Sequence, residues 1–184
     1  GWFGGRSITT KLTYSSETYS DMPSANVPHA RSDAFGRSST TAGYRGGGAD
    51  APSPSNVSNT SKLTFSNETW SLIPGAKLEL GPSQPMRGAS AGNINDAYWM
   101  GTNDNTSITN KFNYSTETIS IGGNLTRGEG DWAASGNVTN AFMSGGDHTS
   151  YMKYIYSADT TSESPANMTF TAIYNTAGSA QDDT

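Results

Sequence analysis

The chain has 184 residues, of which 33% are hydrophobic and 15% are charged, and its net charge is −5. Its Lys and Arg residues form no run, so we do not expect the clustered basic surface that nucleic-acid binding requires. No apolar run approaches the roughly 18 residues of a membrane-spanning helix, and we expect no membrane span. The absence of Cys excludes thiolate catalysis and zinc–thiolate sites.

The composition favours β-structure over a helical bundle. Gly, Ser, Thr and Asn take the place of the Leu and Ile that a thick core needs. Aromatic residues recur in phase along the chain, which argues against disorder. No stretch holds the 3.6-residue period over three turns, so we expect almost no helix.

In chain order, each repeat begins with a small residue, an aromatic residue and Gly. We interpret this as a short buried strand that ends in a Gly turn. Because small and aromatic side chains suit a crowded position, we expect this strand on the inner side of its sheet. The four copies lie at residues 1–5, 42–48, 97–101 and 141–146.

An eight-residue pattern follows: Lys, two variable residues, Tyr or Phe, Ser, one variable residue, an acid and Thr. Its copies are residues 11–18, 62–69, 111–118 and 153–160. The aromatic residue recurs at spacings of 51, 49 and 42 residues, at Tyr14, Phe65, Tyr114 and Tyr156. Such a period with strand-like content is typical of propeller blades.

The start of each Lys motif reads as a strand whose alternate residues face the core. The predicted core side chains are Leu12, Tyr14, Leu63, Phe65, Phe112, Tyr114, Tyr154 and Tyr156. We expect the motif aromatics to be buried, so that truncating Phe65 to Ala costs roughly 3–5 kcal/mol. The Ser and the acid that follow read as turn residues, and the next strand begins at residues 18, 69, 118 and 160.

A looser Pro- or Gly-containing segment then leads to a last element, as at residues 91–93 and 135–137. We predict that this element is the outer strand of its repeat. The Pro-, Ser- and Asn-rich insertion at residues 49–60 is predicted to be a surface loop.

These patterns together predict one all-β repeat domain over residues 1–184. It has four blade-like repeats of about 46 residues each, approximately at residues 1–43, 44–96, 97–140 and 141–184. Two arrangements stay open: a closed ring that brings Gly1 within roughly 15 Å of Thr184, or an open arc that is a segment of a longer repeat protein. The matching phase at the two ends favours closure.

The recurring acids are the first candidates for a chemical site. A ring formed by Glu17, Glu68, Glu117 and Asp159 could hold a cation, but a turn acid that bonds backbone groups or its own motif's Lys or Ser is the simpler interpretation. Gly88–Gly92 matches a nucleophile elbow, yet no helix is expected after it. We therefore predict no catalytic, cofactor or metal site, and no enzyme activity.

Trp132 is the best candidate for a glycan contact, because it lies outside the repeated positions and an exposed indole stacks on sugars. The alternative is a residue that packs between neighbouring blades.

The pairing of Gly1–Gly5 with Tyr14–Thr18 resembles the kelch-like repeats of structural proteins in tailed bacteriophages, particularly those of marine cyanophages. The third repeat departs from the pattern, since Gly101 has no second Gly. The resemblance implies a non-catalytic tail or fibre component, in a virion or extracellular, that assembles with other virion or filament subunits and contacts a host surface glycan. A carbohydrate-binding, lectin-like module of a secreted or cell-surface protein is the alternative function.

Overall fold

The computed structural model describes residues 8–50, 55–79, 88–102, 106–128, 130, 132–145 and 148–167. All regular secondary structure in these ranges is β-strand, paired in antiparallel sheets, and the ranges contain no helix. The all-β prediction is therefore confirmed for the described part of the chain. That part likewise offers no helix long and apolar enough to cross a membrane.

One two-stranded hairpin and three four-stranded sheets follow each other along the chain. The hairpin pairs β1 (Thr9–Thr13) with β2 (Thr18–Met22). Sheet two has the order β4 (Phe35–Ser38), β5 (Ala42–Gly46), β8 (Asn59–Thr64), β9 (Thr69–Lys77). Sheet three is β10 (Ala89–Gly92), β11 (Asp96–Thr102), β12 (Thr106–Asn113), β13 (Thr118–Ile121), and sheet four is β14 (Trp132–Gly136), β15 (Asn140–Gly145), β16 (His148–Ile155), β17 (Thr160–Asn167).

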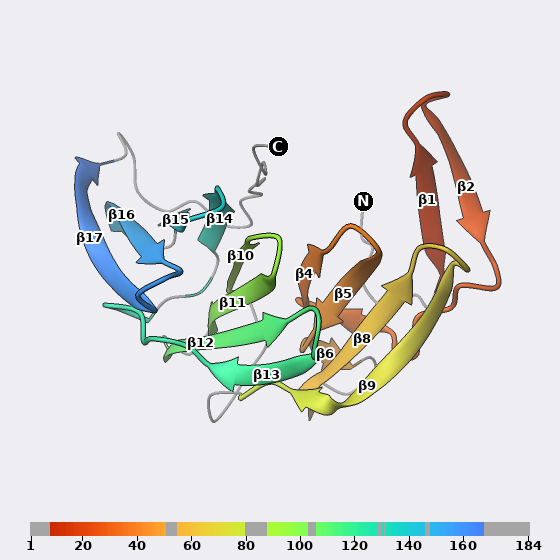
Figure 1. Ribbon diagram of the computed structural model, residues 1–184, viewed down its shortest axis with the longest axis horizontal. Helices are drawn as coiled ribbons and strands as arrows, with labels where there is room; N and C mark the ends of the chain where they lie inside the picture. The colour runs from red at the N-terminus through yellow and green to blue at the C-terminus, as the bar shows by residue number, and fades with distance from the viewer. Residues whose placement is uncertain are drawn as a thin grey trace.

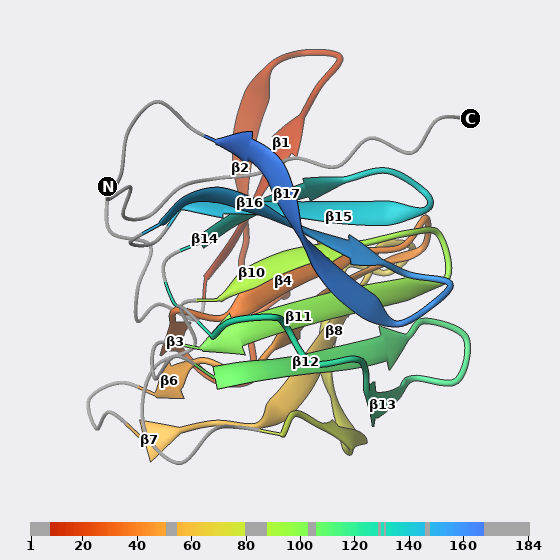
Figure 2. The ribbon, with the colours of Figure 1, turned by 90° about the vertical axis from the view of Figure 1, so that its left-hand side faces the viewer.

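The sheets stand side by side around an open arc, with the hairpin at one end and sheet four at the other (Figure 1). Strands β4, β10 and β14 lie on the inner side of the arc, and β9, β13 and β17 lie on the outer side. Viewed from the sheet-four end, β14 and β15 lie beside β10 and β11 (Figure 2). No sheet in the described ranges closes on itself.

Equivalent residues of the repeats occupy equivalent register positions. The Lys motif provides the third strand of each four-stranded sheet, and its Lys lies opposite the aromatic of the second strand. The cross-strand pairs are Tyr44 with Lys62, Tyr98 with Lys111 and Phe142 with Lys153. The hairpin strands β1 and β2 correspond to the third and fourth strands of the other sheets, since Lys11 lies on β1.

The last element of each repeat is the inner edge strand, so the prediction that it is the outer strand was wrong. Strand β10 connects to β11 through residues 93–95 alone, and a link this short joins antiparallel neighbours. The element thus pairs with the aromatic strand of the next repeat, which becomes the second strand rather than the innermost one. The outer edge is formed by the strand that begins at the motif Thr.

The insertion at residues 49–60 is not a simple surface loop. It contributes β6 (Ala49–Asp50) and β7 (Ser55–Asn56), which form a small sheet with β3 (Arg31–Ser32). The Arg31 guanidinium is buried beneath it and donates hydrogen bonds to the backbone carbonyls of Gly47 (3.0 Å) and Asn59 (2.8 Å). Charge-assisted bonds to carbonyl oxygens anchor the insertion to sheet two.

The core lies between consecutive sheets and consists largely of aromatic residues with Ala and Met. One apolar cluster lies between sheets two and three, and a second lies between sheets three and four. Trp99 is fully buried and passes so close to Gly46 that a Cβ there would lie 2.7 Å from its ring. Gly46 therefore leaves the space that the Trp99 ring occupies between sheets two and three.

The predicted burial of the motif aromatics is confirmed for two repeats and wrong for two. Tyr114 and Tyr156 are 9% and 5% exposed, whereas Tyr14 and Phe65 are 86% and 44% exposed. Tyr114 and Tyr156 are buried by the sheet that precedes each of them along the arc. Within the described residues the hairpin has no preceding sheet, and sheet two is preceded only by the two-stranded hairpin. Gly1 and Thr184 lie outside the described residues, so ring closure within the chain stays a prediction.

We predict that truncation of Phe112 is far more costly than truncation of Phe65. Phe112 is 0% exposed and Phe65 is 44% exposed. Phe112→Ala should lower the free energy of unfolding by about 3–5 kcal/mol, and Phe65→Ala by less than about 2 kcal/mol. Urea denaturation followed by Trp fluorescence measures both. Equal losses would contradict the different packing of the two positions.

Candidate functional site: the repeated seam between sheets

The residues that recur in the sequence meet at one kind of contact, which we call the seam. A seam is formed by the second-strand aromatic and motif Lys of one sheet together with the two motif aromatics and the motif acid of the next sheet. Between sheets two and three, Tyr44 packs against Phe112 and Tyr114, with ring centroids 4.8 and 5.2 Å apart. Between sheets three and four, Tyr98 packs against Tyr154 and Tyr156 at 5.2 and 4.5 Å.

The two aromatic seams have nearly the same geometry. Tyr44 is tilted by 53° to Phe112 and stacked at 22° on Tyr114. Tyr98 is tilted by 54° to Tyr154 and stacked at 21° on Tyr156. Tilted and offset-stacked arrangements are those that the ring quadrupoles favour. The repeated pattern thus encodes one relative placement of two sheets, and the chain uses it more than once.

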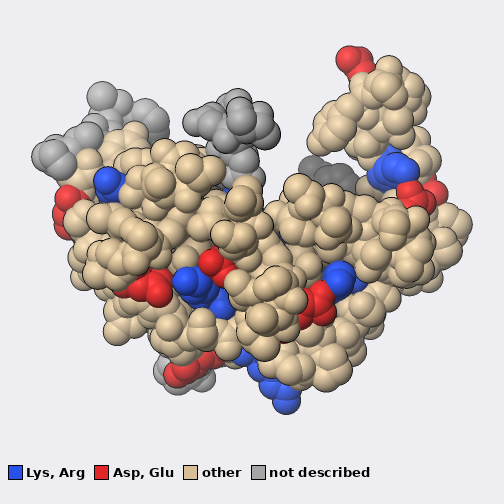
Figure 3. Space-filling view, viewed as in Figure 1, with Lys and Arg blue, Asp and Glu red and all other residues tan. Residues whose placement is uncertain are grey.

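A Lys–acid ion pair accompanies each seam. Lys11 Nζ lies 2.5 Å from Glu68 Oε1, Lys62 forms the same pair with Glu117, and Lys111 Nζ lies 4.0 Å from Asp159 Oδ2. In every case the Lys belongs to one repeat and the acid to the next. Figure 3 shows basic and acidic side chains side by side on the same face at successive points along the arc.

The acids occupy one equivalent place in every repeat, as predicted, but their Lys partner differs from the prediction. Glu17, Glu68, Glu117 and Asp159 all have φ between 51° and 55° in the turn after the motif strand. The left-handed backbone turns the acid toward the preceding sheet, away from its own Lys, which projects from the opposite side of the strand. We expected each acid to bond backbone groups or its own motif's Lys or Ser, but Glu68, Glu117 and Asp159 each pair with the Lys of the preceding repeat.

The ion pair raises the pKa of the Lys62 ammonium above its usual value of 10.5, chiefly through its hydrogen bond with Glu117, against a smaller effect of burial. For Lys111, burial lowers the pKa, but Tyr98, Asp96 and Asp159 raise it by more, so the net shift is upward. Both Lys side chains are therefore held in the charged form at neutral pH.

The seam between sheets three and four contains an additional hydrogen-bonded chain. The Tyr154 hydroxyl donates to Asp159 Oδ1 at 2.6 Å and accepts from the Gly123 N–H at 3.0 Å. Burial, followed by the bond to Asp159, raises the pKa of Tyr154 far above 10. A Cβ at Gly123 would lie 1.7 Å from the Asp159 carbonyl oxygen, so only Gly fits beside this turn. Tyr156 makes a weaker bond to the Gly92 carbonyl at 3.3 Å.

The seam between the hairpin and sheet two is partly open. The Lys11–Glu68 pair is present, and Trp70 Nε1 donates to Thr9 Oγ1 at 2.8 Å. A groove of about 240 Å³ nevertheless lies at the place that Tyr44 and Tyr98 fill in the other seams. Its lining residues are Thr9, Thr10, Lys11, Met22, Leu63, Phe65 and Glu68. The residue that the repeat pattern puts at this place, Trp2, lies outside the described residues.

The structure places Trp132 in the core instead of on the surface. Trp132 is 5% exposed within the apolar cluster between sheets three and four. The Arg127 guanidinium lies 5.8 Å from its ring centroid, and Arg127 is held in turn by Glu163 Oε2 at 2.5 Å. This environment matches the alternative interpretation, a residue that packs between blades. A sugar could stack on Trp132 only if Arg127 and its neighbours moved away.

The other sequence candidates also lie in structural positions. Ser90 of the elbow-like pattern lies on β10 of sheet three. Its hydroxyl donates a hydrogen bond of 2.7 Å to the backbone carbonyl of Gly36 on β4, which belongs to sheet two. Asn103–Asn105 could offer oxygen ligands to Ca²⁺ but lacks the spacing of a calcium-binding loop, and it lies outside the described residues. Among the residues that the structure describes, no three His, Asp or Glu side chains gather closely enough to hold a metal ion.

Comparison with known proteins adds no family to this description: no family model matches the chain, and no curated protein matches it.

We predict that the Lys62–Glu117 pair contributes up to about 1 kcal/mol at neutral pH, as partly exposed pairs do. A Lys whose pKa is raised on folding contributes stability that is present below its unfolded pKa and is lost as pH rises through the folded value. The stability difference between the native chain and Glu117→Gln should therefore shrink as pH rises from about 9 toward 12. Urea titrations across this range measure it. Glu79→Gln is the control, because the Glu79 side chain is exposed and forms no ion pair with any described residue, and it should be neutral throughout.

We predict that Tyr154→Phe costs more than Tyr156→Phe. The first change leaves Asp159 Oδ1 and the Gly123 N–H without their bridging hydroxyl, whereas the second removes one long bond. Loss of a bridging hydroxyl between part-buried groups should lower the free energy of unfolding by about 1–3 kcal/mol, against less than about 1 kcal/mol for Tyr156. Thermal unfolding followed by circular dichroism compares the two. The reverse order would show that the Tyr154 bridge does not stabilise the seam.

Proposed function

We propose that the sheets are blades of a β-propeller and that the chain is a non-catalytic structural component, one that functions by assembly. This proposal rests on the positions of the recurring residues in the structure. The motif Lys, the motif aromatics, the motif acid and the second-strand aromatic all serve contact between consecutive sheets. Residues repeated for catalysis would instead converge on an open polar cleft.

Two features of the fold support blades in particular. Each four-stranded antiparallel sheet runs from an inner to an outer edge strand, as propeller blades do. Successive sheets face each other across an apolar layer, with no helix between them in the described ranges. The kelch-like variant of the fold rests on the sequence resemblance of Gly1–Gly5 and Tyr14–Thr18 alone.

The location in a virion tail or fibre also rests on that resemblance, and the seams are consistent with it. A particle component must keep its shape outside a cell. Here ion pairs, stacked rings and the hydrogen bonds of the Tyr154 and Tyr156 hydroxyls with the preceding sheet's chain segment join successive sheets of a chain that has no Cys. The partners in this proposal are other virion or filament subunits, and the location is the virion or the extracellular space.

The test is the composition of purified particles. Virions encoded by the genome that carries this chain are banded on a density gradient, washed with high salt, and quantified by mass spectrometry against an established capsid subunit. We expect a fixed copy number in every preparation. An amount that varies between preparations, or that is removed by the salt wash, would contradict a structural role.

A further inference from the structure

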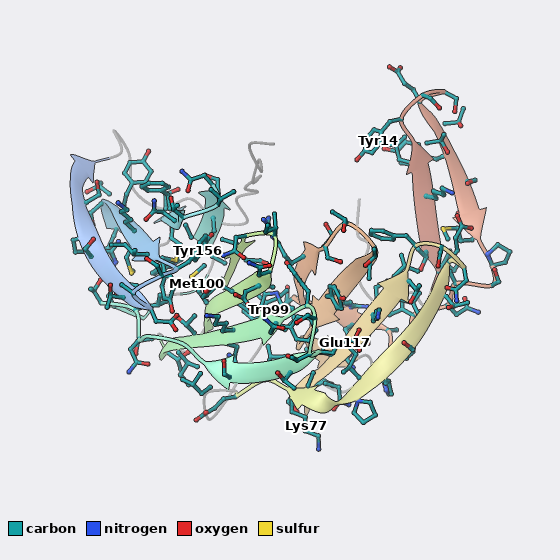
Figure 4. The ribbon with its side chains drawn as sticks, viewed as in Figure 1. Tyr14, Lys77, Trp99, Met100, Glu117 and Tyr156 are labelled. Atoms are coloured by element: carbon teal, nitrogen blue, oxygen red, sulfur yellow. The ribbon has the colours of Figure 1, made fainter. Side chains whose placement is uncertain are left out.

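The two ends of the arc carry the two unmatched halves of one seam. At the sheet-four end, Phe142 occupies the position of Tyr44 and Tyr98, but it is 40% exposed, and Lys153 Nζ lies 5.9 Å from its ring. At the hairpin end, Leu12 and Tyr14 occupy the positions of Phe112 and Tyr114, and Tyr14 is 86% exposed. Figure 4 shows Tyr14 projecting from the hairpin toward the open side of the arc, whereas Tyr156 lies between sheets.

The charges at the two ends are complementary as well. Three of the four motif Lys residues pair with the acid of the following repeat, which leaves Lys153 and Glu17. Neither has an ion-pair partner within the described residues. Glu17 already has the backbone conformation of the paired acids, with φ of 52°. It lies in the hairpin turn, where Figure 3 shows acidic atoms at the tip with no basic atoms beside them.

We infer that the exposed face of sheet four binds the β1–β2 hairpin of a second copy of this chain, head to tail, through a fourth seam. Phe142 of one copy then packs on Leu12 and Tyr14 of the next, and Lys153 pairs with Glu17. The contact joins two different surfaces of the same chain, which is the heterologous type that propagates into rings or filaments. Tyr19, opposite Leu12 on the same hairpin face and 75% exposed, is covered by the same contact.

The occupant is a second copy because the seams set a fixed step from each sheet to the next. The two complete aromatic seams differ by one degree in both ring angles. Repetition of this step leaves the hairpin and sheet four at opposite ends of an open arc (Figure 1). The same step continued beyond sheet four requires a Lys motif against Phe142 and Lys153, and the exposed hairpin of another copy carries the matching Leu12, Tyr14 and Glu17.

Charge reversal tests the inference in trans. Lys153→Glu and Glu17→Lys each place like charges across the fourth seam, so each variant alone should self-associate about five- to tenfold more weakly than the native chain. An equimolar mixture should regain association, because the introduced acid of one variant then meets the introduced lysine of the other, and the native Lys153 meets the native Glu17. Sedimentation velocity measures the association. Lys77→Glu, a reversal at an exposed position on β9, is the control and should associate like the native chain.

Disulfide trapping distinguishes a second copy from closure within one chain, and the absence of native Cys leaves no competing thiol. Under mild oxidation, a mixture of Tyr14→Cys and Phe142→Cys chains should give a covalent dimer, and the double variant should give a ladder. Ser20→Cys, on the opposite hairpin face, should not crosslink to Phe142→Cys. A double variant that yields only an internally linked monomer, or chains that stay monomeric at every concentration, would overturn the inference. Either result leaves the particle-composition test of the proposed function unaffected.

Discussion

The structure depends on one contact, the packing of a second-strand aromatic between the two motif aromatics of the next sheet. A chain with 33% hydrophobic residues cannot build a thick aliphatic core, so it concentrates its apolar area in a few rings at each seam. Burying one such ring contributes about 1.5–3 kcal/mol, and a favourable pair geometry adds about 0.5–1.5 kcal/mol. Tyr98 and Phe112 are both fully buried in this way. The order of the sheets along the arc follows from these contacts.

The ion pairs contribute less to stability than the buried rings do. Lys11 and Glu68 retain 51% and 43% side-chain exposure, and Lys62 and Glu117 retain 27% and 32%. Pairs in such positions contribute at most about 1 kcal/mol, less than a single buried ring. Their effect is on specificity, because a Lys of one repeat finds an acid only when the next sheet stands at the correct height and direction. The rings thus provide most of the stability, and the charges select the placement.

The motif acids share an unusual backbone conformation, and three of them form ion pairs with the preceding sheet. A non-Gly residue in the left-handed region costs of order 1 kcal/mol or more, and four copies accept this cost at the same position. The conformation directs Glu68, Glu117 and Asp159 toward the preceding sheet, where each meets a Lys. Gly at this position would remove the strain but also the charge. The strain is therefore retained where it serves contact between sheets, and Glu17 carries the same geometry to the free end of the arc.

The sequence by itself determined the repeat, the β class, the strand in each Lys motif and the equivalence of the four acids, because these depend on residue type and spacing along the chain. It also identified Tyr114 and Tyr156 as core residues. It could not show that the last element of a repeat pairs with the next repeat, nor that Lys62 meets Glu117 instead of its own motif's acid. It likewise could not show that Trp132 lies beneath Arg127, or that Tyr14 is exposed while Tyr156 is buried. Those outcomes depend on which sheet stands next to which, and identical motifs acquire different environments only when tertiary packing places some inside the arc and others at its ends.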